Sequence, residues 1–156
     1  MRRKDREVTD ESRIDGIIQR CSCCRLGFSD GGEVYIVPMN FGFVKRDGKR
    51  VFYFHSAKEG RKVELLKNGC DVGFEMDCGY ELHPGEVPCD CYAEFSSIIG
   101  TGRAEIVTGE DEKILGLQSL MKQAAGKENC EFRPEMLAAV CVFRLEIDKL
   151  SCKVHL

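Results

Sequence analysis

The stretch from Val51 to Lys62 contains the residue types best placed to do chemistry in this chain. Its first four residues are β-branched or aromatic and predict a half-buried strand, after which a His-Ser-Ala turn leads into a basic helix start. Because a helix start leaves backbone N–H groups unpaired at its positive end, it suits a phosphate. Ser56 offers a hydroxyl there, and Arg61 or Lys62 adds charge. The alternative is that Ser56 only caps the helix and the basic residues are solvated.

Two further stretches have features that suit a bound ligand. Pro38 interrupts the hydrogen-bond ladder of a predicted strand, which frees backbone groups for the polar edge of a flat heterocycle while Phe41 or Met39 packs on its face. The structural alternative is an edge strand that proline protects against aggregation. In residues 96–105, hydroxyls and glycines interrupt an apolar strand. They either reach a ligand or allow the sheet to bend.

The chain has ten cysteines, which raises the question of a metal site. Cys78, His83, Cys89 and Cys91 are potential zinc ligands, but their spacing is irregular and C-x-C is less usual for zinc than C-x2-C. We therefore predict no metal site and interpret the cysteines as reduced thiols. His55, at the strand end, is either a hydrogen-bond donor or proton source in the site, or a structural histidine.

The elements that position these residues are short strands joined mostly by local turns. A first helix follows a cap at Thr9 or Asp10, because Ile14, Ile17 and Ile18 share one face. Six strands are predicted, at 23–28, 33–44, 51–54, 71–77, 94–107 and 140–150. Helices are predicted after residue 60, at 111–125 and from Pro134, and residues 78–91 predict a long loop. Strands in this order favour an antiparallel barrel, mainly β with short helices.

Length and composition exclude several classes of function. At 156 residues the chain is predicted to be a single domain, residues 1–156, with a flexible tail at 1–8. A net charge of −3 argues against nucleic-acid binding. We expect no membrane span and a cytoplasmic protein, since there is neither a long apolar run nor a signal peptide. Without a nucleotide-binding or hydrolase motif, a bound ligand must supply the reactivity.

Five segments in series resemble the nitroimidazole-resistance (Nim-type) branch of the pyridoxamine 5'-phosphate oxidase-like flavoproteins. They are Arg25–Gly27, Tyr35–Gly42, Tyr53–Lys62, Phe74–Asp77 and Ser97–Glu105. The resemblance covers roughly residues 8–150. It implies a six-stranded split β-barrel that forms a homodimer, with two FMN molecules bound at the subunit interface.

The resemblance also implies roles for individual residues. It places the FMN phosphate against Ser56 and Lys62, with Arg61 near, and places Ser97 on a strand that closes the site from the same or the other subunit. The backbone expected against the isoalloxazine ring is that of Pro38, Met39, Asn40 and Phe41. The residues expected to line the ring or the ribityl chain are Tyr53, Phe54 and His55. His55 is the residue implicated in activity.

The function implied by the resemblance is that of an FMN-dependent oxidoreductase that reduces nitro-aromatic compounds such as 5-nitroimidazoles. Because binding FMN does not establish turnover, flavin storage or sensing is an alternative. Pyridoxamine-phosphate oxidation is ranked lower, since the sequence lacks an extra basic cluster for a second phosphorylated ligand. Haem or a deazaflavin in the same barrel, and a metal protein built on Cys78, Cys89 and Cys91, are further alternatives.

Overall fold

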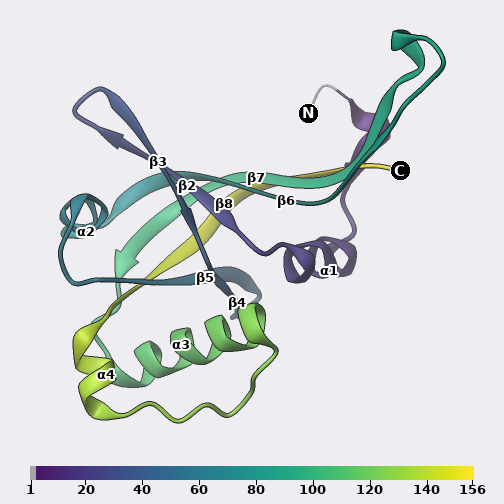
Figure 1. Ribbon diagram of the computed structural model, residues 1–156. Helices are drawn as coiled ribbons and strands as arrows, with labels where there is room; N and C mark the ends of the chain where they lie inside the picture. The colour runs from purple at the N-terminus through teal and green to yellow at the C-terminus, as the bar shows by residue number, and fades with distance from the viewer. Residues whose placement is uncertain (1–2) are drawn as a thin grey trace.

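The computed structural model describes residues 3–156 as one antiparallel sheet accompanied by helices (Figure 1). The strands are β1 (Glu7–Val8), β2 (Cys24–Asp30), β3 (Glu33–Met39), β4 (Gly42–Arg46), β5 (Lys49–Ser56), β6 (Cys70–His83), β7 (Tyr92–Ile106) and β8 (Cys141–His155). The helices are α1 (Glu11–Arg20), α2 (Arg61–Leu66), α3 (Glu110–Ala125) and α4 (Pro134–Ala139), with 3-10 turns at Lys4–Arg6 and Pro88–Asp90. The strand order is β3-β2-β6-β7-β8-β5-β4, with β1 paired to β8. The predicted mainly-β antiparallel class is confirmed.

The chain crosses between the two edges of the sheet at Asn40 and Phe41. β3 pairs with β2 at one edge and β4 pairs with β5 at the other, although only those two residues separate β3 from β4. A link this short spans about 10 Å, so the sheet must roll until its edges approach, as in a split barrel. The prediction that Pro38 lies in an edge strand is confirmed, because an edge strand leaves one row of N–H positions without a partner.

The division at Asn40 also corrects two details of the prediction. Residues predicted as one strand over 33–44 form β3 and β4, and the chain adds β1, so the sheet has eight strands rather than six. The residues of the first three predicted strands do pair antiparallel in series, but the two halves of the predicted strand 33–44 make those pairings at opposite edges, β3 with β2 and β4 with β5. Proline and the two residues after it end the ladder and redirect the chain.

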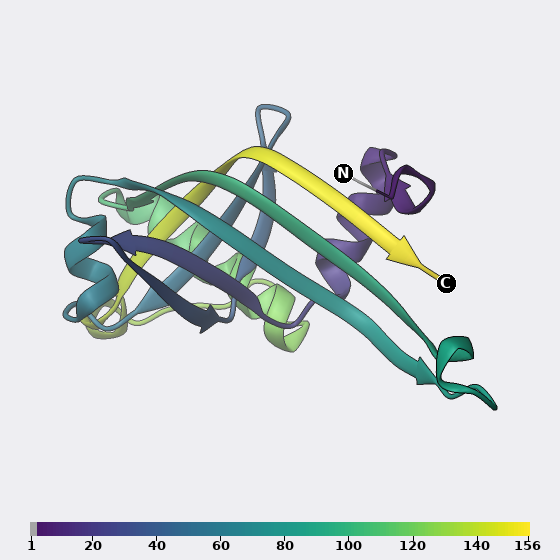
Figure 2. The same cartoon turned by 90° about the horizontal axis from the view of Figure 1, so that it is seen from above.

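The longest strands, β6, β7 and β8, run side by side and curve together (Figure 2). The register between β7 and β8 shifts between Thr101 and Gly102. A Cβ at Gly100 would lie 2.2 Å from the Lys149 carbonyl oxygen, and one at Gly102 would lie 2.1 Å from that of Glu146. The glycines of this strand therefore serve close backbone approach and bending, which is the structural alternative rather than the ligand-binding one.

The helices complete the barrel on two sides. Asp10 caps α1 by accepting a hydrogen bond from the Arg13 amide at 2.7 Å, and the isoleucines of α1 are buried in the main core, as predicted. α3 lies along β4 and β5 (Figure 1). A Cβ at Gly42 would lie 2.1 Å from Ser119 Oγ. Glycine is therefore needed in β4 for α3 to pack this closely on the strand.

Beyond the body of the barrel, β6 and β7 continue as a two-stranded projection (Figure 1). We call residues 79–94 the arm; it begins where the β6–β7 register shifts between Cys78 and Glu81. The prediction of a loop over 78–91 is wrong for its first half, since β6 runs on to His83 and only residues 84–91 lie between the strands. The glycine and proline signal comes mostly from 84–91, whereas Tyr80 and Leu82 suit a strand.

The N-terminal segment is also more ordered than predicted. The expected flexible tail over residues 1–8 includes Glu7 and Val8, yet these two residues pair with Lys153 and Cys152 of β8, and Val8 is buried. Burial of an apolar side chain in a ladder position explains the difference. Residues 1 and 2 lie outside the described part of the chain. No helix in residues 3–156 is long and apolar enough to cross a membrane.

Candidate functional site

The end of β5 separates its last two side chains onto opposite faces of the sheet. Phe54 belongs to the main core inside the barrel, whereas Tyr53 packs with the smaller cluster under α3. Because side chains alternate along a strand, His55 follows Tyr53 on the α3 side and Ser56 follows Phe54 on the inner side. His55 is exposed and Ser56 is half-buried. The two polar groups are adjacent in sequence but face different surroundings.

Ser56 does not cap a helix, contrary to the structural alternative. Its hydroxyl donates to the Ala57 carbonyl oxygen at 2.8 Å, and α2 begins five residues later, after Gly60. Gly60 accepts the first helical bonds with its backbone and has a φ of 125°, which favours glycine. The strand therefore reaches α2 through a short linker rather than directly. The backbone N–H groups at the start of α2 therefore do not lie directly after Ser56 in the chain, as the sequence had predicted for a phosphate site.

Basic side chains nevertheless act on Cys141, the cross-strand partner of Ser56. Ser56 pairs with Cys141 across the β5–β8 ladder. Burial raises the pKa of the Cys141 thiol, and the positive charges of Lys113, Lys58 and Lys62 partly oppose that rise. The three ammonium groups are thus close enough to Cys141 to affect the pKa of its thiol. Lys113 donates to the Val140 carbonyl oxygen at 2.7 Å, which leaves Lys58 and Lys62 as the ammonium groups available to an anion.

Arg61 is occupied by side chains of the β2–β3 turn. Its guanidinium donates to Asp30 Oδ2 at 2.7 Å and to Glu33 Oε2 at 2.9 Å, and lies 4.7 Å from the centre of the Tyr35 ring. These contacts raise the pKa of Arg61, with the hydrogen bond to Asp30 as the largest cause. Arg61 fixes α2 against the hairpin and, in one chain, is not free to bind a phosphate.

The aromatic residues predicted to line the cofactor are core residues. The side chains of Phe41, Tyr53 and Phe54 are fully buried. The Tyr53 hydroxyl donates to Glu112 Oε1 at 2.9 Å and accepts from Arg46 at 2.9 Å, and burial is the main cause of its raised pKa. These side chains hold α3 and the barrel together. Any contact they make with a ligand must use their backbone atoms.

The Pro38–Phe41 segment does lie beside the end of β5. Gly42 pairs with Tyr53, so the residues before Gly42 lead past the positions that follow Tyr53. Pro38 and Asn40 are exposed and Met39 is half-buried against the core. Residues 38–40 therefore precede a ladder that starts opposite Tyr53, two residues before His55.

Ser97 lies far from this region. It pairs with Lys153 on β8, whereas Ser56 pairs with Cys141 on the same strand. Those partners are twelve residues apart in sequence, which corresponds to roughly 40 Å along an extended strand. One chain therefore does not bring Ser97 and Ser56 to a common ligand.

The surface hollows of residues 3–156 also fail to bring the predicted site residues together. The five described are lined by residues outside the predicted set. The largest, of about 560 Å³, lies between α3 and β4 and is lined partly by Phe43, Leu115 and Ser119. The predicted residues form an open surface at the end of β5 rather than a closed pocket.

Sequence analysis missed Lys58 and Cys141 as neighbours of Ser56. Lys58 was visible as a basic residue near the turn, but no local signal pairs Ser56 with Cys141, which is 85 residues away. The potential zinc set of Cys78, His83, Cys89 and Cys91 is not assembled either. The one metal-competent group found in residues 3–156 contains His83 with two glutamates and no cysteine.

Comparison with known proteins identifies the family. A family model described as pyridoxamine 5'-phosphate oxidase matches residues 10–154. The chain belongs to this family. The match spans the sheet from α1 to β8, including both the end of β5 and the β3–β4 crossing. A comparison with curated proteins finds no match.

Solved structures of similar fold agree with this assignment. A "putative 5-nitroimidazole antibiotic resistance protein" from Bacteroides thetaiotaomicron is 28% identical, with a TM-score of 0.79 over 95% of this chain and 86% of that one. The flavocytochrome Anf3 from Azotobacter vinelandii is 21% identical, with a TM-score of 0.79 over 100% of this chain and 72% of that one. An FAD- and heme-binding protein from Mycobacterium smegmatis is 17% identical, with a TM-score of 0.79 over 96% and 73%. The latter two share the split-barrel-like fold.

Proposed function

We propose that this member of the pyridoxamine 5'-phosphate oxidase family binds FMN and acts as an oxidoreductase on nitro-aromatic compounds such as 5-nitroimidazoles. The observation that carries the proposal is the full-length similarity to the Bacteroides protein, at 28% identity over 95% of this chain. A bound flavin would supply the electron transfer, which no side chain of this protein provides by itself.

The donor set at the end of β5 fits the phosphate of such a cofactor. Ser56 carries a hydroxyl, and Lys58 and Lys62 bring positive charge to the same strand end. A phosphate binds through charge-assisted hydrogen bonds of this kind. Lys62 is half-buried whereas Lys58 is exposed, so we assign Lys62 the larger share of phosphate binding. Arg61 would contribute only by leaving Asp30 and Glu33.

The backbone of Pro38 to Asn40 suits the ring of the cofactor. It is exposed at a sheet edge beside the end of β5, so its N–H and C=O groups are available to the polar edge of a heterocycle. The buried Phe41 and Phe54 hold this backbone in place from beneath. His55 is an exposed titratable group at the end of β5 and is the residue we propose to move a proton.

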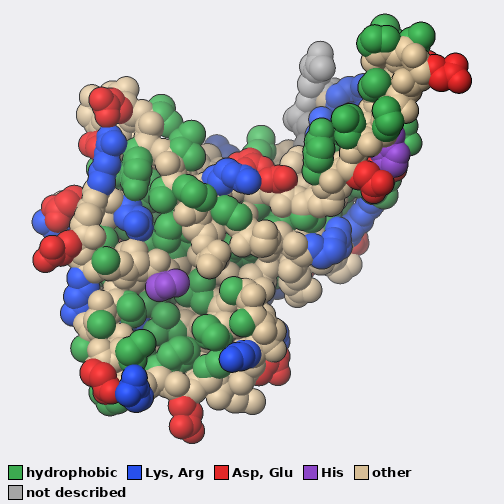
Figure 3. Space-filling view, viewed as in Figure 1, with side chains coloured by type: hydrophobic (Ala, Val, Ile, Leu, Met, Phe, Trp, Pro, Cys, Tyr) green, Lys and Arg blue, Asp and Glu red, His purple; other side chains and the backbone are tan. Residues whose placement is uncertain are grey.

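We also propose that two copies of the chain complete the site. In support, Ser97 and the Ser56 region lie at opposite ends of β8, so a ligand that touches both needs a second chain. Large apolar side chains also remain exposed on the arm, including Tyr80, Leu82 and Tyr92, and Figure 3 shows hydrophobic side chains gathered along this projection. Burial of such side chains against a second copy would stabilise a homodimer.

The first test is the visible absorption spectrum of the purified protein, with the released cofactor identified by chromatography. We expect one FMN per chain, reduction of the flavin by NADH or NADPH, and consumption of a 5-nitroimidazole. A protein that binds FMN without consuming the acceptor is a storage or sensing protein, and a protein that binds no flavin contradicts the proposal. Lys62→Ala should lose FMN more readily than Lys58→Ala; equal retention would remove the assignment to Lys62.

Complementation tests the two-chain site. Lys62→Ala and Ser97→Phe are each expected to bind FMN poorly and to keep a mass of twice 17.6 kDa. A site built from two chains contains Lys62 of one copy and Ser97 of the other, so a mixed dimer of the two variants has one intact site. Mixing the variants should restore FMN binding to part of the population. No recovery in a confirmed mixed dimer would place each site within one chain.

A further inference from the structure

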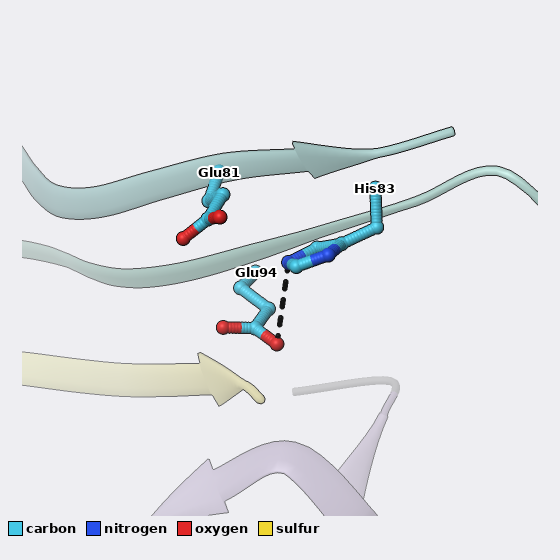
Figure 4. A group of neighbouring side chains, drawn as sticks. All are labelled: Glu81, His83 and Glu94. Carbon is cyan, nitrogen blue, oxygen red and sulfur yellow. Dashed lines mark ion pairs between the residues drawn. The ribbon is translucent and has the colours of Figure 1, made fainter.

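Three side chains on the arm converge on one point outside the site proposed above. Glu81 of β6 and Glu94 of β7 are direct cross-strand partners, and His83 follows Glu81 on the same face, two residues on. Figure 4 shows Glu81, His83 and Glu94 over this face of the arm. One donor atom from each, two carboxylate oxygens and an imidazole nitrogen, lies within 4.8 Å of the other two.

The imidazole of His83 is held in place but makes no hydrogen bond to the described residues through its Nε2 atom. Its ring stacks on Tyr92, with centres 4.6 Å apart and planes 10° from parallel. Its Nε2 is shielded from solvent and makes no hydrogen bond in the described part of the chain. Glu94 Oε1 is 3.4 Å away, close enough for an ion pair but without a hydrogen bond. A buried polar atom left in this state costs free energy unless something binds it.

The two glutamates present a second unfavourable feature. Like charges placed directly opposite each other on neighbouring strands repel and destabilise the pair. Glu81 and Glu94 occupy such positions in a hairpin where only two strands pair. A cation bound between them would remove the repulsion and would occupy the unpaired Nε2 of His83 at the same time.

We propose that Glu81, His83 and Glu94 bind a divalent transition-metal ion of the zinc class. Zinc–nitrogen and zinc–oxygen distances of about 2.1 Å place two tetrahedral ligands about 3.4 Å apart. The Nε2–Oε1 separation of 3.4 Å matches that spacing. An imidazole with carboxylates favours Zn²⁺, Ni²⁺ or Cu²⁺ over Mg²⁺ or Ca²⁺, which prefer oxygen alone.

The consequence of binding is mechanical. The ion joins β6 to β7 beyond the register shift at Cys78 and Glu81, where no third strand of the described chain pairs with the arm and the His155 side chain of β8 contacts it at the Ala93 carbonyl oxygen and the Tyr92 ring. Isolated two-stranded hairpins are marginally stable in water. Three protein ligands leave a coordination position for water or for a group from another molecule, so the ion stiffens the arm and remains exchangeable. This site is separate from the flavin proposal and does not depend on it.

The test is titration of chelator-treated protein with Zn²⁺ against a chromophoric competitor. We expect one Zn²⁺ per chain, with no competition from millimolar Mg²⁺. His83→Phe keeps a flat ring to stack on Tyr92 but has no nitrogen to bind the ion. Loss of a residue that only hydrogen-bonds to a metal ligand typically weakens metal binding ~10–100-fold, so loss of the ligand itself should weaken Zn²⁺ binding by at least that factor. Glu81→Gln should weaken it as well.

Matched variants distinguish this site from zinc binding elsewhere on the arm. Glu86→Gln changes the same group on an exposed arm residue outside the cluster and should bind Zn²⁺ like the wild type. Cys89→Ser/Cys91→Ser should also bind normally, and Co²⁺ in the wild type should show no thiolate charge-transfer band. Unchanged binding by His83→Phe, a thiolate band, or the absence of binding by the wild type would overturn the proposal. Zn²⁺ should also slow amide exchange at Leu82 in the wild type but not in His83→Phe.

Discussion

The body of the barrel and the arm are made from the same strands, β6 and β7, but are stabilised differently. In the body, each of these strands has neighbours on both sides, and the core beneath them includes the fully buried Phe52, Phe54 and Met76. In the arm, the strands pair only with each other, and Tyr80 and Leu82 expose 68% and 58% of their surface. One continuous strand can therefore have a stable part and a part that opens more easily.

The arm therefore depends on something beyond its own contacts. Both proposals made above supply such a partner, a second copy of the chain for its apolar side chains and a metal ion for its polar face. The body needs neither, because α1 and α3 cover its core from within the chain. Substitutions made in one region at a time test whether the two regions differ in this way.

The largest expected difference comes from removing one large side chain in each region. Phe54→Ala deletes a fully buried ring that stacks on Phe143 with centres 5.0 Å apart. We expect it to lower the free energy of unfolding by about 3–5 kcal/mol. Leu82→Ala in the arm should change it by less than about 0.5 kcal/mol. Urea unfolding at a protein concentration low enough to keep the chain monomeric measures both; equal losses would show that arm and body unfold as one unit.

Glycines give a second, smaller contrast. Gly102→Ala places a Cβ against the backbone of Glu146, which cannot move without disturbing β8, and should destabilise by about 1–3 kcal/mol. Gly79→Ala meets open space but has a φ of 66°, so about 1 kcal/mol is expected. Gly27→Ala is the control, since its nearest neighbour would be the Gly73 carbonyl oxygen at an ordinary 3.7 Å and its φ is not positive. Thermal melts should rank the three variants in that order.

Buried thiols in the body make stability depend on pH. Burial raises the pKa of Cys24 above its ordinary value of 9.0, and raises that of Cys21 likewise. The unfolded chain loses these protons first, so the stability present below about pH 9 should fall as pH rises above it. Each thiol contributes a slope of up to about 1.4 kcal/mol per pH unit.

Variants assign that slope to one region. Cys24→Ala should reduce the alkaline loss of stability measured by urea unfolding between about pH 8 and pH 10, whatever its effect at neutral pH. An unchanged slope in Cys24→Ala would assign the alkaline loss of stability to other groups.

The smallest effect on folding is expected from a charge on the exposed face of the arm. Leu82→Lys should leave the unfolding of the monomer almost unchanged, because Leu82 is 58% exposed. If the arm packs against a second copy, the same variant should weaken dimerisation by at least about tenfold, since a buried charge is costly. Sedimentation velocity measures the effect, with Glu86→Lys as the control on the same arm. A dimer unaffected by Leu82→Lys would exclude this face from the interface.

Local signals were sufficient for most of the elements. The spacing of Ile14, Ile17 and Ile18 predicted α1 with its cap at Asp10, and Pro134 marked the start of α4. Loop composition was misleading in the arm, where the glycine and proline content of residues 84–91 concealed the strand that precedes them. Sequence analysis also predicted β3 and β4 as one strand. Pro38 indicates that the hydrogen-bond ladder is broken there, but not that the residues on its two sides pair at opposite edges of the sheet.

The candidate site was less predictable than the elements. The sequence singled out Ser56 and Lys62; Ser56 pairs with Cys141 at the end of β5, and the charge of Lys62 acts on that thiol. It could not show that Asp30 and Glu33 occupy Arg61, because that contact joins segments about thirty residues apart. Nor could it show that alternation would bury Tyr53 and Phe54 on opposite faces of the same strand.

The family, the antiparallel class and the strand that carries Ser56 follow from the sequence, because these depend on local patterns of side chains. Three other features appear only in the folded chain: β3 and β4 take opposite edges of the sheet, Ser97 lies at the far end of β8 from Ser56, and Glu81, His83 and Glu94 meet on the arm. Each of these depends on which strands pair and in what register. Register is set by the burial of whole strands against one another, which no short segment of sequence contains.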